Sequence, residues 1–216
     1  MASAEWTIIE LAEHLGLIDL VTVIDCALHR KETTTGSIRA TMRKGRRGVR
    51  VLRRALDLCD GRSESPWESA LRLLFELSGI CVKPQVSLRD SQGTFVARVD
   101  LLIVGTKRVA EYDGAGHREK AQHRDDLRRE KYLSRIGYER FGYVDTEIRT
   151  LPAMIIRDGE DALGLRNDPA RLKLWNHEFE ASSLSSDGWR ALIRRLQRFV
   201  RTTTPRPTKA ASGASL

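Results

Sequence analysis

Two apolar runs joined by Gly105-Thr106 constrain the fold of this chain more than any other feature. Residues 94–104 and 107–113 read as extended segments with apolar residues in each, and a two-residue loop that begins with glycine is typical of a type II′ hairpin turn. If the residues flanking the loop face each other, the numbers of opposed residues add up to 211, so Asp100 lies opposite Glu111. Opposed side chains share one face with Cβ atoms about 5 Å apart, where like charges destabilise a sheet. The hairpin therefore predicts two carboxylates that need a counter-charge.

A third acid and one arginine share this face. Asp113 lies two residues beyond Glu111, and the same register places Arg98 opposite Asp113. Under one interpretation, Mg²⁺ or Mn²⁺ binds between Asp100 and Glu111, because hard carboxylate oxygens suit these ions. Under the other, the acids lie at strand ends and Arg98 neutralises them. The apolar neighbours in both strands favour the metal, since an unpaired acid in a buried sheet costs several kcal/mol.

A metal held by two carboxylates indicates phosphodiester hydrolysis, because such an ion polarises a phosphoryl group and activates water. The net charge of +8 is compatible with a polyanionic partner, and residues 30–62 alone hold eleven Lys or Arg and three acids. This basic stretch could contact DNA phosphates, or it could be a solvated helix face. The sequence leaves both interpretations open. The arginines that we single out as DNA contacts are Arg46, Arg47, Arg53 and Arg54.

The order of elements indicates an α/β fold with helical additions. The helices expected before the sheet cover residues 5–16, 17–29, a short stretch after 33–35, and 48–59, and a further helix covers 65–79. Strands are expected at 82–88, 94–104, 107–113 and 138–144, with a helix at 118–136 between the last two. We therefore divide the chain into a basic helical segment (1–62), an α/β domain (63–150), a helical extension packed on it (151–200) and a disordered tail (201–216).

Composition excludes several classes of protein. No run of about 18 uncharged apolar residues is present, and the first residues lack the basic and apolar regions of a signal peptide, so we expect a cytoplasmic protein without a membrane span. The three cysteines, Cys26, Cys59 and Cys81, are far apart and form no C-x-x-C motif. This spacing argues against a disulfide framework or a zinc site and predicts small buried hydrophobic residues.

Four stretches together resemble a known family. They are ESPWES (64–69), FVARVDLLIV (95–104), RVAEYDGAGH (108–117) and DDLRREKYLSRIGYERF (125–141). These motifs, within roughly residues 63–147, are similar to the uncharacterised Vsr-like (very-short-patch-repair endonuclease-like) family of the PD-(D/E)XK restriction-endonuclease fold. The resemblance implies an αβββαβ core, a mixed sheet flanked by helices, and Asp100 and Glu111 as metal ligands. Asp113 occupies the position where the wider fold carries lysine.

Three further residues are candidates for the same site. His117 follows a glycine-containing loop and precedes a helix, where a neutral histidine could act as acid or base, as the resemblance implies; the alternative is a surface or capping histidine. Ser65-x-x-Glu68 is a capping box, yet the resemblance places a glutamate of this helix at the metal. Arg129 lies three residues after Asp126, so it could form a solvated ion pair or, as the resemblance suggests, hold an acid or a phosphate.

These observations predict a Mg²⁺- or Mn²⁺-dependent endonuclease that hydrolyses DNA in repair or defence and that could act as a homodimer. A non-catalytic DNA-binding or regulatory protein, antitoxin-like and retaining the nuclease fold, is the alternative. A third hypothesis is a structural protein in which the acids only hold the sheet together. The fold alone does not decide among them.

Overall fold

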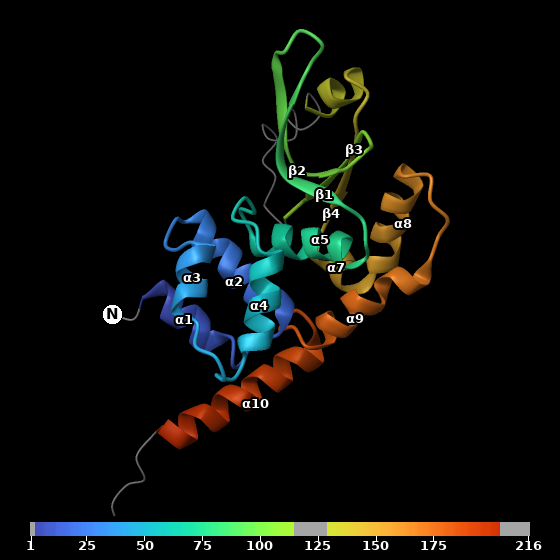
Figure 1. The fold of residues 1–216 in the computed structure, drawn as a ribbon. Helices are drawn as coiled ribbons and strands as arrows, with labels where there is room; N and C mark the ends of the chain where they lie inside the picture. Colours follow the sequence, from blue (N-terminus) through green and yellow to red (C-terminus); the bar gives the residue numbers. More distant parts are fainter. Residues whose placement is uncertain (1–2, 115–128, 204–216) are drawn as a thin grey trace, which may run out of the picture.

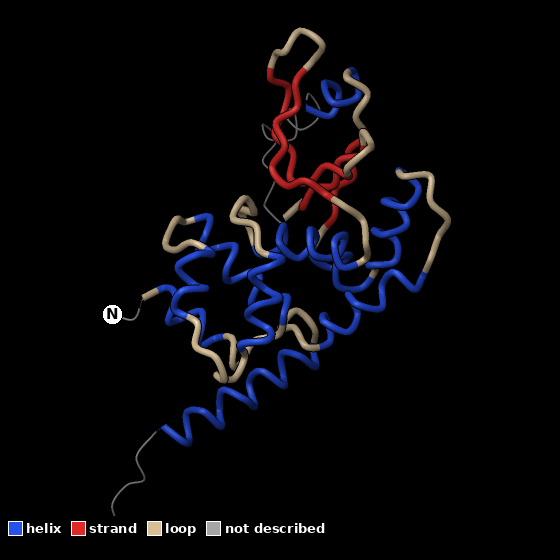
Figure 2. Tube along the Cα trace, viewed as in Figure 1, coloured by secondary structure: helices blue, strands red, loops and turns tan. Residues whose placement is uncertain are grey.

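The computed structural model describes residues 3–114 and 129–203, with side chains described up to residue 197. Helices pack against a four-stranded mixed sheet whose β1–β2 hairpin projects from the main body, so the chain is an α/β protein (Figures 1 and 2). Within the described residues, no helix is both long enough and apolar enough to cross a membrane. The candidates His117 and Asp126 lie outside the described residues.

Four helices precede the sheet domain, as the sequence predicts. They are α1 (Ala4–Leu11), α2 (Leu17–His29), α3 (Thr35–Thr41) and α4 (Val49–Leu58). Ser3 and Thr34 cap α1 and α3 through their side-chain oxygens, which accept backbone N–H groups of the first turn. Helix α4 begins at Gly48 without a side-chain cap.

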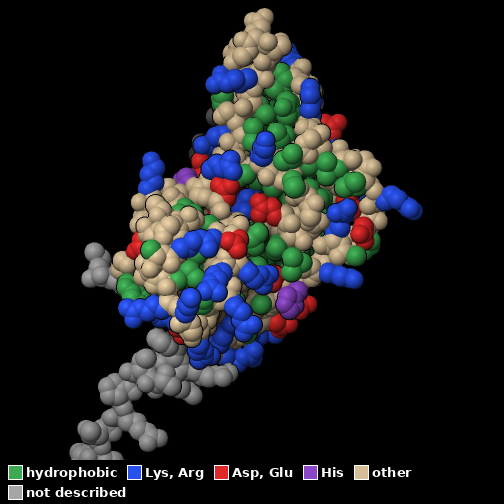
Figure 3. Space-filling model, in the orientation of Figure 1, with side chains coloured by type: hydrophobic (Ala, Val, Ile, Leu, Met, Phe, Trp, Pro, Cys, Tyr) green, Lys and Arg blue, Asp and Glu red, His purple; other side chains and the backbone are tan. Residues whose placement is uncertain are grey.

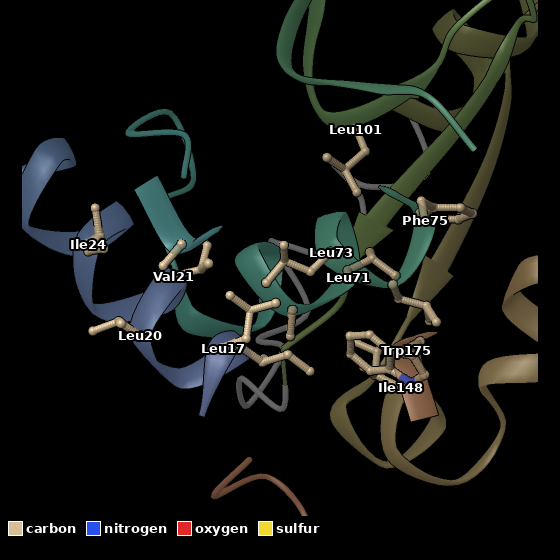
Figure 4. Close-up of a cluster of buried hydrophobic side chains, with 14 of the residues drawn as sticks. Leu17, Leu20, Val21, Ile24, Leu71, Leu73, Phe75, Leu101, Ile148 and Trp175 are labelled. Carbon is tan, nitrogen blue, oxygen red and sulfur yellow. The ribbon is translucent and has the colours of Figure 1, made fainter. Parts of the chain in front are cut away.

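Helix α5 (Pro66–Leu77) is the centre of the molecule. Ser65 caps it and Pro66 occupies its first position, as predicted. All residues from Ser69 to Phe75 are buried, because α5 packs against the sheet on one side and other helices elsewhere. Figure 4 shows side chains of α2, α5 and β2 in one buried cluster, which spans the chain from Ile8 to Trp175. The basic helical segment thus shares its core with the sheet domain.

The strands are β1 (Val82–Arg89), β2 (Phe95–Ile103), β3 (Arg108–Tyr112) and β4 (Glu139–Tyr143). They lie in the order β1-β2-β3-β4, with the first three antiparallel and β4 parallel to β3. Leu101 and Ala110 pack on the α5 face, whereas Leu102 and Val109 pack with Leu133 on the other. Residues 129–135 are helical, so helices cover both faces of the sheet.

The predicted hairpin register is confirmed, but the predicted turn is wrong. Leu101 pairs with Ala110 and Leu102 with Val109, and both pairs add up to 211. The strands stop at Ile103 and start again at Arg108, so four residues connect them. The N–H of Thr106 donates to the carbonyl of Ile103 (3.2 Å), which makes Gly105 the third residue of the turn. Its φ of +84° suits that position, which favours glycine.

The C-terminal region is mostly helical, as predicted. It contains α7 (Asp145–Thr150), α8 (Pro152–Ala162), a 3₁₀ turn (Pro169–Arg171), α9 (Leu172–Glu180) and α10 (Ser186–Thr203). Trp175 is fully buried beside α5. Helix α10 continues three residues into the predicted tail, and residues 204–216 lie outside the described part.

The prediction that the cysteines are buried is wrong. Cys26 and Cys81 are exposed and Cys59 is half-buried. Cys26 lies on the outer face of α2 and Cys81 precedes β1, so neither side chain faces the core. Burial raises the pKa of the Cys59 thiol to about 11, which makes this cysteine a poor nucleophile.

Candidate active site

Asp100 and Glu111 lie beside each other in the hairpin register, and the charge of Glu68 acts on Asp100 from another element. Glu68 comes from the first turn of α5, Asp100 from β2 and Glu111 from β3. The negative charge of Glu68 raises the pKa of Asp100, and the negative charge of Asp100 raises the pKa of Glu111. The capping box and the hairpin thus contribute to one site, although some thirty residues separate Glu68 from Asp100 along the chain.

Asp100 is half-buried, and its Oδ2 accepts a hydrogen bond from the backbone N–H of Tyr112 (3.0 Å). Burial raises the pKa of Asp100, and the nearby charge of Glu68 raises it further, although the Tyr112 hydrogen bond acts against both. The ionised form of this carboxylate is therefore destabilised, and a cation would favour it.

Glu111 is only 3% exposed, and arginines hold both of its carboxylate oxygens. Arg129 Nη2 donates to Oε1 (2.5 Å), and Arg140 Nε donates to Oε2. Burial raises the pKa of Glu111, and the two guanidinium groups lower it. The like charges predicted across the hairpin are therefore compensated by arginines in this structure.

Asp113 is held by the same arginine. Arg140 Nη2 donates to Asp113 Oδ1, so one guanidinium contacts both Glu111 and Asp113. Gly142 lies beneath Asp113, and a Cβ atom at Gly142 would collide with the Asp113 carboxylate. Glycine in β4 is thus required for this close approach.

The alternative interpretation, in which Arg98 neutralises the strand acids, names the wrong arginine. Arg98 Nη2 instead donates to Glu64 (2.8 Å) in an exposed pair, while its carbonyl accepts from Arg129 (2.6 Å). The counter-charge comes from β4, which pairs with β3 in parallel. Counting along the hairpin could not find it, because β4 follows only after the helix that crosses the sheet.

The hydrogen bonds of Glu68 lie at the start of α5 and extend to β1. Its N–H donates to Ser65 Oγ (3.2 Å), as in a capping box, but its carboxylate reaches one residue further back, to the N–H of Glu64 (2.9 Å). The same Oε2 accepts from Gln85 Nε2 (3.0 Å). Glu68 therefore stabilises the start of α5, and through Gln85 it is linked to the strand position opposite Asp100.

Gln85 is a site residue that the sequence reasoning missed. In β1, residues 82–84 and 86–88 pair with β2 in one register, and the skipped position, Gln85, lies opposite Asp100. Gln85 has a φ of +53°, which is costly for a residue with a side chain. Such strain is often stored at functional sites. The one sequence signal was Pro84, because proline inside a strand marks an edge or an irregularity.

The four arginines predicted to bind DNA differ in their surroundings. Arg46 pairs with Glu13 (2.9 Å) and Arg54 with Glu178 (2.7 Å). Arg47 and Arg53 are exposed, and neither forms an ion pair with any residue in the described ranges. In Figure 3, Lys and Arg side chains gather over α4 and the adjoining stretch of α10.

Comparisons with known proteins do not assign a function to this chain. No family model matches the chain, and no solved structure matches it. Two curated relatives, Uncharacterized protein MT2308 and Uncharacterized protein Rv2248 of Mycobacterium tuberculosis strains, are each 27% identical to this chain over 153 residues. The alignment covers 69% of this chain and 56% of each relative, so the chain spans about half the length of these relatives.

Proposed function

We propose that this chain is a metal-dependent endonuclease that hydrolyses phosphodiester bonds in DNA. The observation that carries the proposal is geometric: the hairpin register places Asp100 beside Glu111, and on the other side of Asp100 in the sheet lies Gln85, which donates to Glu68. The element order supports it, since a helix, three antiparallel strands, a helix and a parallel fourth strand agree with a restriction-endonuclease-like core. That finer fold assignment is part of the proposal.

The donor set fits Mg²⁺ or Mn²⁺. These ions prefer oxygen ligands, and Mg²⁺ takes one or two protein carboxylates together with water and phosphate oxygens. Asp100 and Glu111 would hold the ion. Among the residues that the structure describes, no group of three or more His, Cys, Asp or Glu side chains is arranged to hold a metal ion, so water and phosphate oxygens would complete the coordination. When bound, the ion would polarise the phosphoryl group and lower the pKa of a water molecule.

Arg140 supplies a cation next to Asp113, where the wider fold is expected to carry lysine. Its guanidinium contacts Glu111 and Asp113, and its side chain is 25% exposed. A guanidinium matches two phosphate oxygens at once. In our proposal Arg140 orients the scissile phosphate and stabilises its negative charge, and Asp113 positions Arg140. His117, outside the described residues, is proposed as the acid or base.

Arg129 and Glu68 act at the borders of the site. Arg129 is 36% exposed and donates both to Glu111 and to the carbonyl of Arg98, so it can contact a phosphate while it keeps β2 and β3 in place. The Glu68 carboxylate accepts a hydrogen bond from Gln85, and its negative charge repels the charge of Asp100. This repulsion increases the affinity of Asp100 for a cation.

The test combines cleavage with metal binding. Wild type should nick a supercoiled plasmid in Mg²⁺ or Mn²⁺ but not in EDTA, and Asp100→Asn and Glu111→Gln should abolish nicking. Asp187→Asn, which removes an exposed charge on α10, is the matched control and should cleave like wild type. Mn²⁺ should raise the unfolding midpoint of wild type and leave that of Asp100→Asn unchanged, because a ligand that binds only the folded state stabilises it. Absence of nicking together with a midpoint indifferent to Mn²⁺ would overturn the proposal.

A non-catalytic DNA-binding protein is the second candidate. It is favoured by one observation, which is that arginines satisfy both oxygens of Glu111. In that case Arg140 and Arg129 are structural counter-charges, and the strand acids need no metal. Duplex DNA binding in EDTA, without cleavage and without any effect of Mn²⁺ on the midpoint, would identify this function.

A further inference from the structure

An open, strongly cationic groove lies at the start of α4. Its volume is about 940 Å³, and six of the ten residues that line it are cationic, with no acid among them. The cationic residues are Lys44, Arg46, Arg47, Arg50, Arg53 and Arg54. A concentration of like charge of this size repels itself and attracts a polyanion.

The backbone of the groove also favours an anion. Gly48 caps α4 with a φ of +76°, and a Cβ atom at Gly48 would lie 2.2 Å from the carbonyl oxygen of Ala12. This contact excludes a Ser or Asp cap, so the first turn has no side-chain acceptor for its N–H groups. The first turn also lacks an acid, and it carries Arg50 where the helix dipole favours negative charge.

The arginines of the groove fall into two groups. Arg46 and Arg54 are held by Glu13 and Glu178. Within residues 3–114 and 129–203, the exposed Arg47, Arg50 and Arg53 form no ion pair. The second group lines the groove without a protein counter-charge and is the group that can bind a ligand.

The surface continues onto α10. This helix passes beside the loop that leads into α4 (Figure 1), and its Leu196 lines a hollow of about 250 Å³ together with Arg46. Arg190 and Arg194 are exposed on α10, and Figure 3 shows Lys and Arg side chains gathered over this part of the surface. The cationic surface is therefore longer than the groove itself.

The groove lacks the aromatic side chains on which bases of single-stranded nucleic acid stack. Proteins bind single-stranded nucleic acid largely by stacking bases on aromatic side chains, and no aromatic residue lines this groove. The nearby Trp6 is already covered by the guanidinium groups of Arg43 (5.6 Å) and Arg46 (5.4 Å). Phosphate contacts are the chemistry that the groove offers.

We infer that this groove binds the phosphate backbone of double-stranded DNA through Arg47, Arg50 and Arg53 and the start of α4, without sequence preference. The inference rests on the proposed action on DNA, and it adds a duplex-binding site distinct from the carboxylates. Glu13 holds Arg46 and Glu178 holds Arg54 at the sides of the groove, so these two arginines shape the groove around the ligand.

The experiment measures binding of the full chain to a short labelled duplex by fluorescence anisotropy, in EDTA and across a range of salt concentrations. The triple variant Arg47→Glu, Arg50→Glu, Arg53→Glu should bind at least about tenfold more weakly. Its salt slope should fall by about 2.7, since each phosphate contact contributes about 0.9. A control variant with the same change of net charge, Arg157→Glu, Arg166→Glu, Lys173→Glu, lies on exposed positions elsewhere and should bind within about threefold of wild type.

Equal losses in the two triple variants would overturn the inference, because net charge alone would then explain binding. Single-stranded DNA bound as tightly as the duplex would also overturn it. The carboxylate site is tested separately, by nicking of the supercoiled plasmid in Mg²⁺ or Mn²⁺. DNA binding that depends on the groove, without any cleavage, would refute the proposed nuclease activity and support the groove as a binding site. Cleavage and binding that the groove variant leaves unchanged would support the nuclease activity and refute the groove.

Discussion

The guanidinium groups of Arg129 and Arg140 lie against buried or half-buried acids, whereas those of Arg47, Arg50 and Arg53 line an open groove without an acid among its residues. The same side chain therefore has opposite surroundings in two regions of one molecule. At the strands, a carboxylate that is 3% exposed receives hydrogen bonds on both oxygens. At α4, the helix dipole meets further positive charge.

The difference follows from desolvation. A charge removed from water is expensive unless it is paired, so the fold must bring a partner to Glu111. A charge on the surface is hydrated and needs none, so it is available for a ligand. The first region should respond strongly to loss of a partner, and the second should respond mainly in binding.

The largest expected effect on stability is that of Arg140→Met. This change leaves Glu111 and Asp113 without their shared guanidinium, and breaking a buried pair in this way costs about 3–5 kcal/mol. Urea denaturation would measure it. Arg98→Met is the control, because Arg98 and Glu64 form an exposed pair of the kind worth about 0–1 kcal/mol. Similar losses for both variants would show that Glu111 does not depend on Arg140.

Asp100→Asn should stabilise the protein without divalent metal. Burial raises the folded-state pKa of Asp100 above its ordinary value of 3.8, so the folded state binds the proton more tightly than the unfolded state does. Wild type should therefore lose stability as pH rises from about 3.8 through the raised pKa, by about 1.4 kcal/mol for each unit of the shift. The variant should lack this loss, which denaturation at several pH values would reveal. A variant that is less stable than wild type at neutral pH would make Asp100 a structural acid.

Substitutions of Gln85 should change stability less, and the order of stability of two variants tests whether its backbone is strained. Gln85→Ala and Gln85→Gly both remove the hydrogen bond to Glu68, but only glycine relieves the φ of +53°. The glycine variant should therefore be more stable than the alanine variant by about 1 kcal/mol. In an ordinary strand the order is reversed, because glycine loses more entropy on folding. Thermal unfolding of the pair decides between the two.

The smallest effect is expected in the groove. Arg50→Glu places an acid in the first turn of α4 and should stabilise the fold by about 0.3–1 kcal/mol. Arg54→Glu on the same helix is the contrasting variant, since it turns the ion pair with Glu178 into a repulsion and should lower the unfolding midpoint. If both changes lower stability, the start of α4 is already satisfied within the protein.

Much of this chain could be predicted locally. The residues of α2 match the predicted 17–29, the four strands match within two residues at each end, and Ser65 caps α5. The two confirmed pairs, Leu101 with Ala110 and Leu102 with Val109, give the register that places Asp100 beside Glu111. Periodicity, caps and hairpin counting carry this information, because each depends on residues that are close in sequence.

The tertiary structure decided how the charges are compensated. Arg140 reaches Glu111 from a parallel strand 29 residues later, Gln85 leaves the ladder opposite Asp100, and Glu68 arrives from α5. Pairing of this kind depends on how elements stack and cross, and a one-dimensional pattern contains no distances between them. The sequence by itself determined which strands would carry acids and where the positive charge would be concentrated. Burial, which exists only once the helices close over both faces of the sheet, decided which of those charges needed partners and which were left open to a ligand.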